Sequence, residues 1–81
     1  MTDTVGLDTL EPGEKGTIRK IKGRGPIRRR IADMGVVPGV VVEVERVAPL
    51  GDPVEVKLLG YHLSLRKEEA KGISVEPLPD I

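Results

Sequence analysis

Residues 40–58 read VVVEVERVAPLGDPVEVKL, and this stretch decides the fold. In residues 40–47, valines and charged side chains alternate, which is the pattern of a strand with one buried face. Residues 54–58 alternate in the same way. Between the two runs stand Pro49 and Pro53, which lack the N–H group that a central strand needs. We therefore predict two strands joined by a rigid, wide loop that lets them diverge, as the wall of a small barrel requires.

Further short elements follow on the C-terminal side. Gly60 predicts a tight reversal into a strand over residues 61–65. Residues 66–70, RKEEA, predict one helical turn, and residues 73–75 predict a short closing strand. The two prolines that follow predict the end of regular structure.

On the N-terminal side, residues 16–21 predict a strand with a bulge or a bend, because Ile18 and Ile21 are three apart and break the alternation. A helix is predicted over 26–34. Its isoleucines at positions 27 and 31 and its methionine at position 34 recur at i, i+4 and i+7, and its first residue is a proline. Gly35 follows as a helix-ending residue. About nine residues are too few for a stable isolated helix, so this one must dock on the strands.

The predicted fold class is mainly β, a five-stranded small barrel with one inserted helix and one short helical turn. We expect a flexible tail over residues 1–6, a single domain over 7–76 and a second flexible tail over 77–81. A length of 81 residues allows one domain only.

Composition limits the chemistry. Thirteen basic and thirteen acidic side chains give zero net charge, unlike the excess of a general nucleic-acid binder. The absence of cysteine excludes disulfides and thiolate metal sites. Because the sequence shows no secretory signal and no long apolar run, we expect a soluble, cytoplasmic protein without direct membrane insertion.

Catalysis is not expected. His62 and Ser64 share a strand face, but catalysis by such a pair also needs an orienting acid and an oxyanion site, so we interpret His62 as a solvent-facing strand histidine. The carboxylate pairs Glu43/Glu45 and Glu68/Glu69 fit solvated charge and local salt pairing. No metal-ligand spacing and no phosphate-binding loop occur, so we predict no cofactor and no metal site.

The run Arg28–Arg30 leaves three interpretations open. It could grip RNA or anionic headgroups, although no stacking aromatics accompany it. Three consecutive arginines also point about 100° apart on a helix and can simply solvate it. Thirdly, arginine is enriched in protein interfaces, where it would frame any exposed apolar residue at Ile31, Met34, Val36 or Val37.

Four motifs occur in order: L-x-x-L-x-P-G at Leu7–Gly13, R-R-I-x-D-M-G-V-x-P-G at Arg29–Gly39, R-V-A-P-L-G-D-P-V at Arg46–Val54, and L-R-K-E-E-A at Leu65–Ala70. Together they closely resemble the FeoA family of bacterial ferrous iron transport. The resemblance implies an SH3-like barrel and a non-enzymatic accessory protein that acts on FeoB, a membrane transporter of Fe²⁺ with a cytosolic GTP-hydrolysing domain. Similar domains end some iron- or manganese-dependent repressors.

The resemblance makes protein interaction the leading hypothesis. The expected partner is the cytosolic part of a FeoB-like transporter, with no nucleic acid, and self-association is left open. RNA or anion binding through Arg28–Arg30 and metal sensing are the alternatives. The predicted contact residues come from the helix, its exit turn and the proline loop: Arg28, Ile31, Met34, Gly35, Val36, Pro49 and Leu50. On this hypothesis, Ile31→Asp should weaken binding of the partner without unfolding the protein.

Overall fold

The computed structural model describes residues 3–23 and 25–79. Along the chain, its elements are β1 (Val5–Gly6), a 3-10 turn η1 (Leu7–Thr9), β2 (Lys15–Ile21), α1 (Gly25–Asp33), β3 (Val41–Val47), β4 (Val54–Leu58), β5 (Tyr61–Leu65), α2 (Lys67–Lys71) and β6 (Ile73–Pro77). The helix, the hairpin strands and the helical turn predicted from the sequence are all present, with ends shifted by one or two residues.

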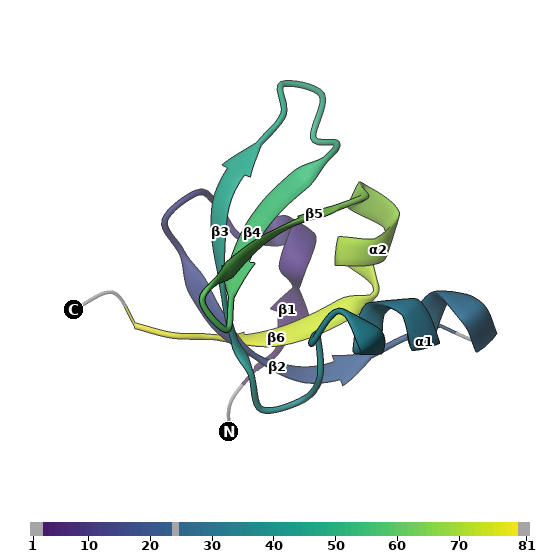
Figure 1. Cartoon of the computed structure of the whole chain (residues 1–81). Coiled ribbons are helices and arrows are strands. Elements are labelled where there is room, and N and C mark those ends of the chain that lie inside the picture. Colours follow the sequence, from purple (N-terminus) through teal and green to yellow (C-terminus); the bar gives the residue numbers. More distant parts are fainter. Residues whose placement is uncertain (1–2, 24, 80–81) are drawn as a thin grey trace.

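The strands form one antiparallel sheet in the order β1-β6-β2-β3-β4-β5. In the described part of the chain the sheet has six strands, and no ladder joins β1 to β5, so it is curved but open (Figure 1). Within residues 3–23 and 25–79, the sheet therefore has six strands where five were predicted, and it does not close into a barrel. The sixth strand, β1, has only two residues, which is too short to carry an alternation pattern.

The two ends of the chain are more ordered than predicted. Val5 and Gly6, assigned to a tail, pair with Val75 and Ser74 of β6. At the other end, β6 continues to Pro77, and the Leu78 N–H donates to the Lys15 carbonyl at 2.9 Å. Residues 5–6 and 77–78 are therefore held by backbone hydrogen bonds and do not belong to flexible tails. Composition does not reveal such pairing. Residues 1–2 and 80–81 lie outside the described residues.

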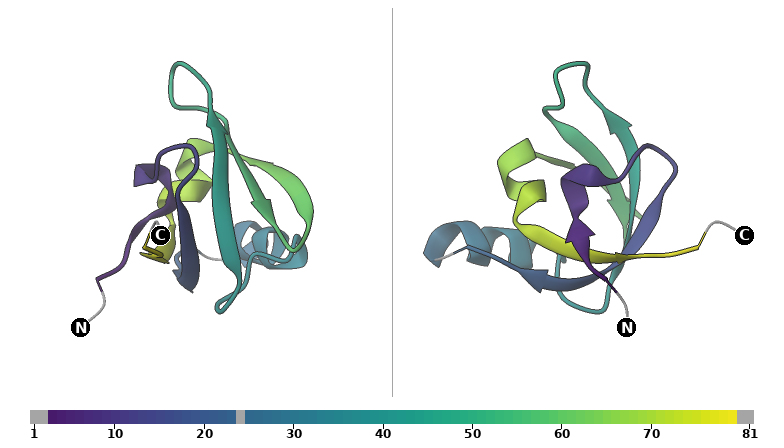
Figure 2. Two further views of the ribbon diagram at one scale, coloured as in Figure 1. Left: turned by 90° about the vertical axis from the view of Figure 1, so that its left-hand side faces the viewer. Right: turned by 180° about the vertical axis from the view of Figure 1, so that it is seen from behind.

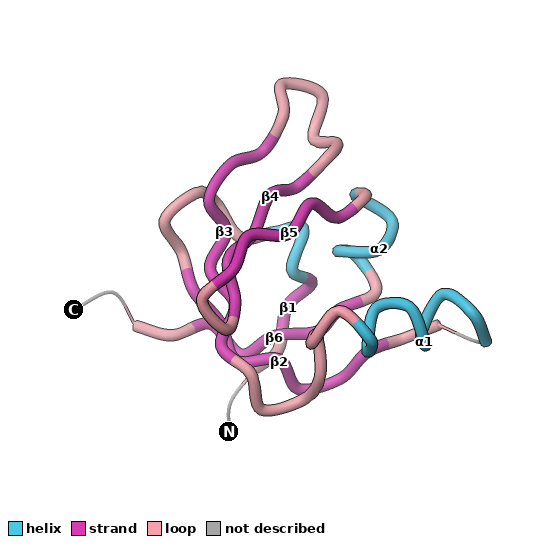
Figure 3. The backbone as a smooth tube through the Cα atoms, viewed as in Figure 1, coloured by secondary structure: helices cyan, strands magenta, loops and turns pink. Residues whose placement is uncertain are grey.

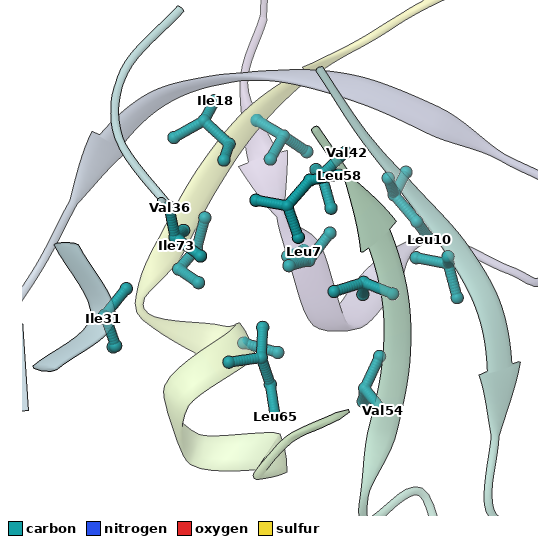
Figure 4. Packing of buried hydrophobic residues seen from close by; sticks show 14 of the residues in the cluster. Leu7, Leu10, Ile18, Ile31, Val36, Val42, Val54, Leu58, Leu65 and Ile73 are labelled. Carbon is teal, nitrogen blue, oxygen red and sulfur yellow. The ribbon is translucent and has the colours of Figure 1, made fainter. Parts of the chain in front are cut away.

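The core is aliphatic throughout, as the lack of Phe and Trp requires (Figure 4). Its buried members come from every strand except β1: Leu7, Leu10, Ile18, Ile21, Ile31, Val36, Val42, Val44, Val54, Val56, Leu58, Leu65, Ala70, Ile73 and Val75. Alternate residues of β4 are buried and exposed, which confirms the alternation predicted for this strand. Among the described residues, no polar or charged side chain is buried.

Two register shifts bend the sheet. The bulge expected in β2 lies between Ile18 and Lys20, opposite β6. A second shift, which the sequence did not indicate, lies in β3 between Val44 and Arg46. Bulges increase local twist and curl the sheet around its core.

The proline loop closes a hairpin instead of parting two strands. β3 and β4 stay paired up to Val47 and Val54, directly at the loop, so the predicted divergence is wrong. A turn inside the loop is closed by the Gly51 N–H, which donates to the Ala48 carbonyl at 2.7 Å. At the loop's base, Asp52 accepts a hydrogen bond from the Lys67 N–H at 3.0 Å, which ties the loop to α2.

Candidate docking surface on α1 and its exit turn

Helix α1 lies beside the sheet with most of its surface exposed. Figures 1 and 2 show it projecting to one side, away from the C-terminal end of the chain. Of the described residues of α1, Ile31 alone is buried, with 2% of its surface exposed. Ile27, one turn earlier and predicted on the same inner face, is 59% exposed. Ile31 is thus the side chain by which the described part of α1 enters the buried core (Figure 4).

The end of α1 is fixed by a Schellman motif. The Val36 N–H donates to the Ile31 carbonyl at 3.2 Å, and the Gly35 N–H donates to the Ala32 carbonyl at 2.9 Å. Gly35 has a φ of +89°, which is why glycine suits this position. Val36 and Ile31 are both buried, which supplies the apolar contact that accompanies this motif. The sequence prediction of Gly35 as the helix-ending residue is confirmed.

Exposed and partly exposed apolar residues lie at this exit turn and on the β4–β5 turn that touches it, and we call them the exit patch. Its members are Met34, Gly35, Val37, Leu59 and Tyr61. A Cβ atom on Gly35 would lie 2.7 Å from the Tyr61 hydroxyl and 3.0 Å from Leu59 Cδ1, so the β4–β5 turn touches the helix exit. Val37, Leu59 and Tyr61 are 37%, 65% and 38% exposed.

Leu59 occupies an unfavourable backbone conformation. Leu59 and Gly60 have φ values of +51° and +82°, the two positive values of a type I′ hairpin turn. Asn or Asp normally precedes the glycine in such a turn, because these residues tolerate the left-handed region. A large apolar residue there costs about 1–3 kcal/mol of backbone strain. Because the Leu59 side chain is mostly exposed, its burial within this chain contributes little free energy to offset this strain.

An ion pair fastens α1 to α2. Arg30 pairs with Glu69, and the other carboxylate oxygen of Glu69 accepts the Arg66 N–H at 2.9 Å. Figure 3 shows the two helices next to each other on one side of the strands. The pair is partly exposed, so it contributes modestly to stability and chiefly fixes the angle of α1.

The structure divides the predicted contact residues into three groups. Ile31 and Val36 lie in the core, 2% and 1% exposed, so a partner cannot reach them and they leave the candidate surface. Arg28 is exposed on α1, and Met34 and Gly35 belong to the exit patch. Pro49 and Leu50 belong to the β3–β4 loop, and this loop lies apart from α1 (Figures 1 and 2).

Sequence reasoning missed Ile27 and Leu59 as contact candidates. Periodicity places Ile27 and Ile31 on one face of the helix, and it does not reveal that only the part around Ile31 packs against the core. The signal for Leu59 was present: a Leu-Gly pair stands between two alternating runs, where Asn-Gly is the usual choice.

His62 and Ser64 are exposed on β5, as predicted. His62 Nδ1 lies 2.5 Å from Glu45 Oε1, which faces it from β3 at the second bulge. Among the described residues, no group of three or more His, Asp or Glu side chains could hold a metal ion. No helix in the described part of the chain is long and apolar enough to cross a membrane.

Comparison with known proteins decides the family. The model of the FeoA domain family matches residues 5–77. The chain belongs to the FeoA family. Over 70 residues, it is 43% identical to a fusion of Fe(2+) transport protein A with the Fe(2+) transporter FeoB from Porphyromonas gingivalis. That alignment covers 86% of this chain but only 8% of the fusion protein.

Two solved structures of the family fix the fold class. A FeoA-like protein from Clostridium acetobutylicum is 44% identical, with a TM-score of 0.89 over 100% of this chain and 94% of the other. FeoA from Stenotrophomonas maltophilia, solved with zinc and described as a prokaryotic SH3 domain protein, is 25% identical with a TM-score of 0.74. These two alignments confirm the FeoA resemblance, and the second covers 89% of each chain. The fold is therefore mainly β and SH3-like, with an open sheet.

Proposed function

We propose that this protein is an accessory module of ferrous iron transport that docks on the cytosolic part of a FeoB-like transporter. In the Porphyromonas gingivalis relative, a FeoA segment and FeoB form one polypeptide. Two domains on one chain meet at a high effective concentration, so fusion suits partners that work together. The module itself carries out no chemistry and acts by favouring one conformational state of the transporter or its GTPase domain.

The observation that carries this proposal is Leu59. It combines a positive φ with a 65% exposed apolar side chain, directly beside the helix exit. Strained residues persist where function uses them, and an exposed leucine in a strained turn is favoured by a contact outside the chain. Burying such a side chain against a partner is worth about 1.5–3 kcal/mol, which is enough to offset backbone strain of similar size.

RNA binding through Arg28–Arg30 is less well supported. Arg30 is already paired with Glu69, which leaves Arg28 and Arg29. The single aromatic residue, Tyr61, packs at the exit patch and offers no stacking platform beside them. Direct Fe²⁺ sensing is the third candidate, and anaerobic calorimetry with Fe²⁺ tests it.

Leu59→Asn tests the proposal, because it should affect stability and docking in opposite directions. Asn tolerates the left-handed turn, so the free energy of unfolding should rise by about 0.5–1 kcal/mol. Loss of the apolar contact should weaken binding to the cytosolic domain of a FeoB-like transporter about tenfold, or ~1.4 kcal/mol. Urea unfolding and calorimetry measure the two quantities.

Leu78→Asn is the matched control. Leu78 is 38% exposed and lies beside Lys15, away from α1, so this variant should bind as the unchanged protein does. Equal binding by Leu59→Asn and the unchanged protein would remove the exit patch from the interface. Leu50→Asn tests the β3–β4 loop in the same assay: weaker binding places it in the interface, and unchanged binding removes it.

A further inference from the structure

A cleft of about 740 Å³ lies between α1 and α2. Pro26, Ile27 and Ile31 provide its apolar wall, and Gly23 and Gly72 also line it. Charged side chains of both signs form the rest of the lining: Lys22, Arg30, Arg66, Glu68 and Glu69. From α1 the cleft is lined by residues in the range 26–31, whereas the exit patch lies beyond the C-terminal end of the helix.

The protein itself buries only part of the apolar wall of this cleft. Ile31 is buried beneath it, but Ile27, one turn away, is 59% exposed at its mouth. A helix of nine residues held by one buried side chain and one ion pair is weakly attached. An apolar side chain that entered the cleft beside Ile27 would complete the packing of α1.

The lining of the cleft carries three basic side chains, Lys22, Arg30 and Arg66, against the two carboxylates of Glu68 and Glu69. The segment 15–32, from which Lys22 and Arg30 come, contains eight basic side chains and no acidic one. Among the described residues, Lys22, Arg28 and Arg66 form no ion pair. Arg30 is paired by Glu69, and Glu68 is the remaining carboxylate in the lining. An occupant with negative charge therefore complements the rim.

We propose that the α1–α2 cleft binds an acidic polypeptide segment that inserts an apolar side chain beside Ile27. This inference rests on the proposed docking function and gives the chemistry of the partner's contact segment. Carboxylates of the segment face Lys22 and Arg66, while its apolar side chain fills the wall between Pro26 and Ile27. An amphipathic segment laid in a groove is a common mode of recognition. Nucleic acid fits less well, since phosphates gain nothing from an aliphatic wall.

Three synthetic peptides of equal length test this inference by NMR titration of the isotope-labelled full chain. The first alternates pairs of Glu and Leu, the second replaces every Glu by Lys, and the third replaces every Leu by Ser. The first peptide should shift the amide signals of Gly23, Ile27 and Gly72 saturably. The other two should leave these signals unchanged, because one lacks the charge and the other the apolar side chain.

Variants separate the two components of binding. Ile27→Ser should weaken binding of the first peptide about tenfold, from lost apolar burial of roughly 1.4 kcal/mol. Lys22→Glu should weaken it about fivefold and reduce its dependence on salt. Lys57→Glu is the matched control, because it makes the same charge reversal at an exposed position of β4. It should have no effect on binding of the first peptide.

Several results would overturn the inference. The first is an equal shift of the amide signals with all three peptides. The second is an equal loss of binding in Lys57→Glu and Lys22→Glu. The third is that the amide signals of the cleft residues shift only when oligouridylate or phosphatidylglycerol vesicles are added. Failure here is distinguishable from failure of the docking function. If Leu59→Asn weakens binding to the transporter domain and Lys22→Glu does not, docking stands and the cleft is not part of it.

Discussion

Ile31→Asp is expected to abolish the native packing of α1 and to remove most of the stability of the fold. Ile31 is 2% exposed, and loss of a buried isoleucine costs about 2–5 kcal/mol. A carboxylate placed in an aliphatic core adds several kcal/mol or forces the helix away from the strands. A chain of 81 residues has a free energy of unfolding of roughly 4–12 kcal/mol, so little would remain.

This result reverses the expectation drawn from the sequence, in which Ile31→Asp weakened docking and left the fold intact. Ile27→Asp is the matched variant, with the same change one helical turn earlier at a 59% exposed position. It should change the free energy of unfolding by less than about 1 kcal/mol, since an acidic residue near a helix N-terminus is favourable. Urea unfolding that shows similar losses for both variants would contradict the placement of α1.

Gly35→Val is expected to lower the free energy of unfolding by about 3 kcal/mol. A φ of +89° costs an L-residue roughly 1–2 kcal/mol, and more for a β-branched one. The new Cβ would also stand 2.7 Å from the Tyr61 hydroxyl and 3.0 Å from Leu59 Cδ1. Relief of that collision must displace the β4–β5 turn, so the exit patch is disturbed together with the Schellman motif.

Gly39→Val separates backbone strain from collision. Gly39 has a φ of +98°, but no atom lies within 4 Å of its would-be Cβ. Its substitution should therefore cost the strain alone and leave binding to the transporter domain unchanged. Equal losses of stability and binding for the two valine variants, compared by thermal unfolding and calorimetry, would show that the contact between Gly35 and the β4–β5 turn has no role.

The parts of the fold that the sequence predicted are those where one chemical pattern dominates. β4 alternates without interruption, α1 begins and ends with Pro and Gly signals, and β2 shows its bulge as a broken alternation. β1 could not be predicted in this way, because two residues carry no period and the strand exists only through pairing with β6. The sequence likewise could not predict that the sheet stays open, because this depends on which strands pair in the folded chain.

The candidate site was predicted only in outline. The sequence indicated α1 and its exit turn, but it could not distinguish Ile27 from Ile31, because both fit the same helical face. It grouped Leu50 with α1, although the β3–β4 loop that contains Leu50 lies apart from this helix (Figure 1). The apolar side chain that completes the exit patch, Leu59, comes from a turn 24 residues beyond Gly35, and that proximity arises only on folding.

Hydrogen exchange on the complex tests the central claim most directly. The free, full-length protein should exchange rapidly along α1, because few buried contacts hold this helix. With the cytosolic domain of a FeoB-like transporter present, exchange should slow in α1, the exit turn and the β4–β5 turn, and stay unchanged in β2. Protection that spares α1 and the β4–β5 turn, or no complex at all, would contradict the account.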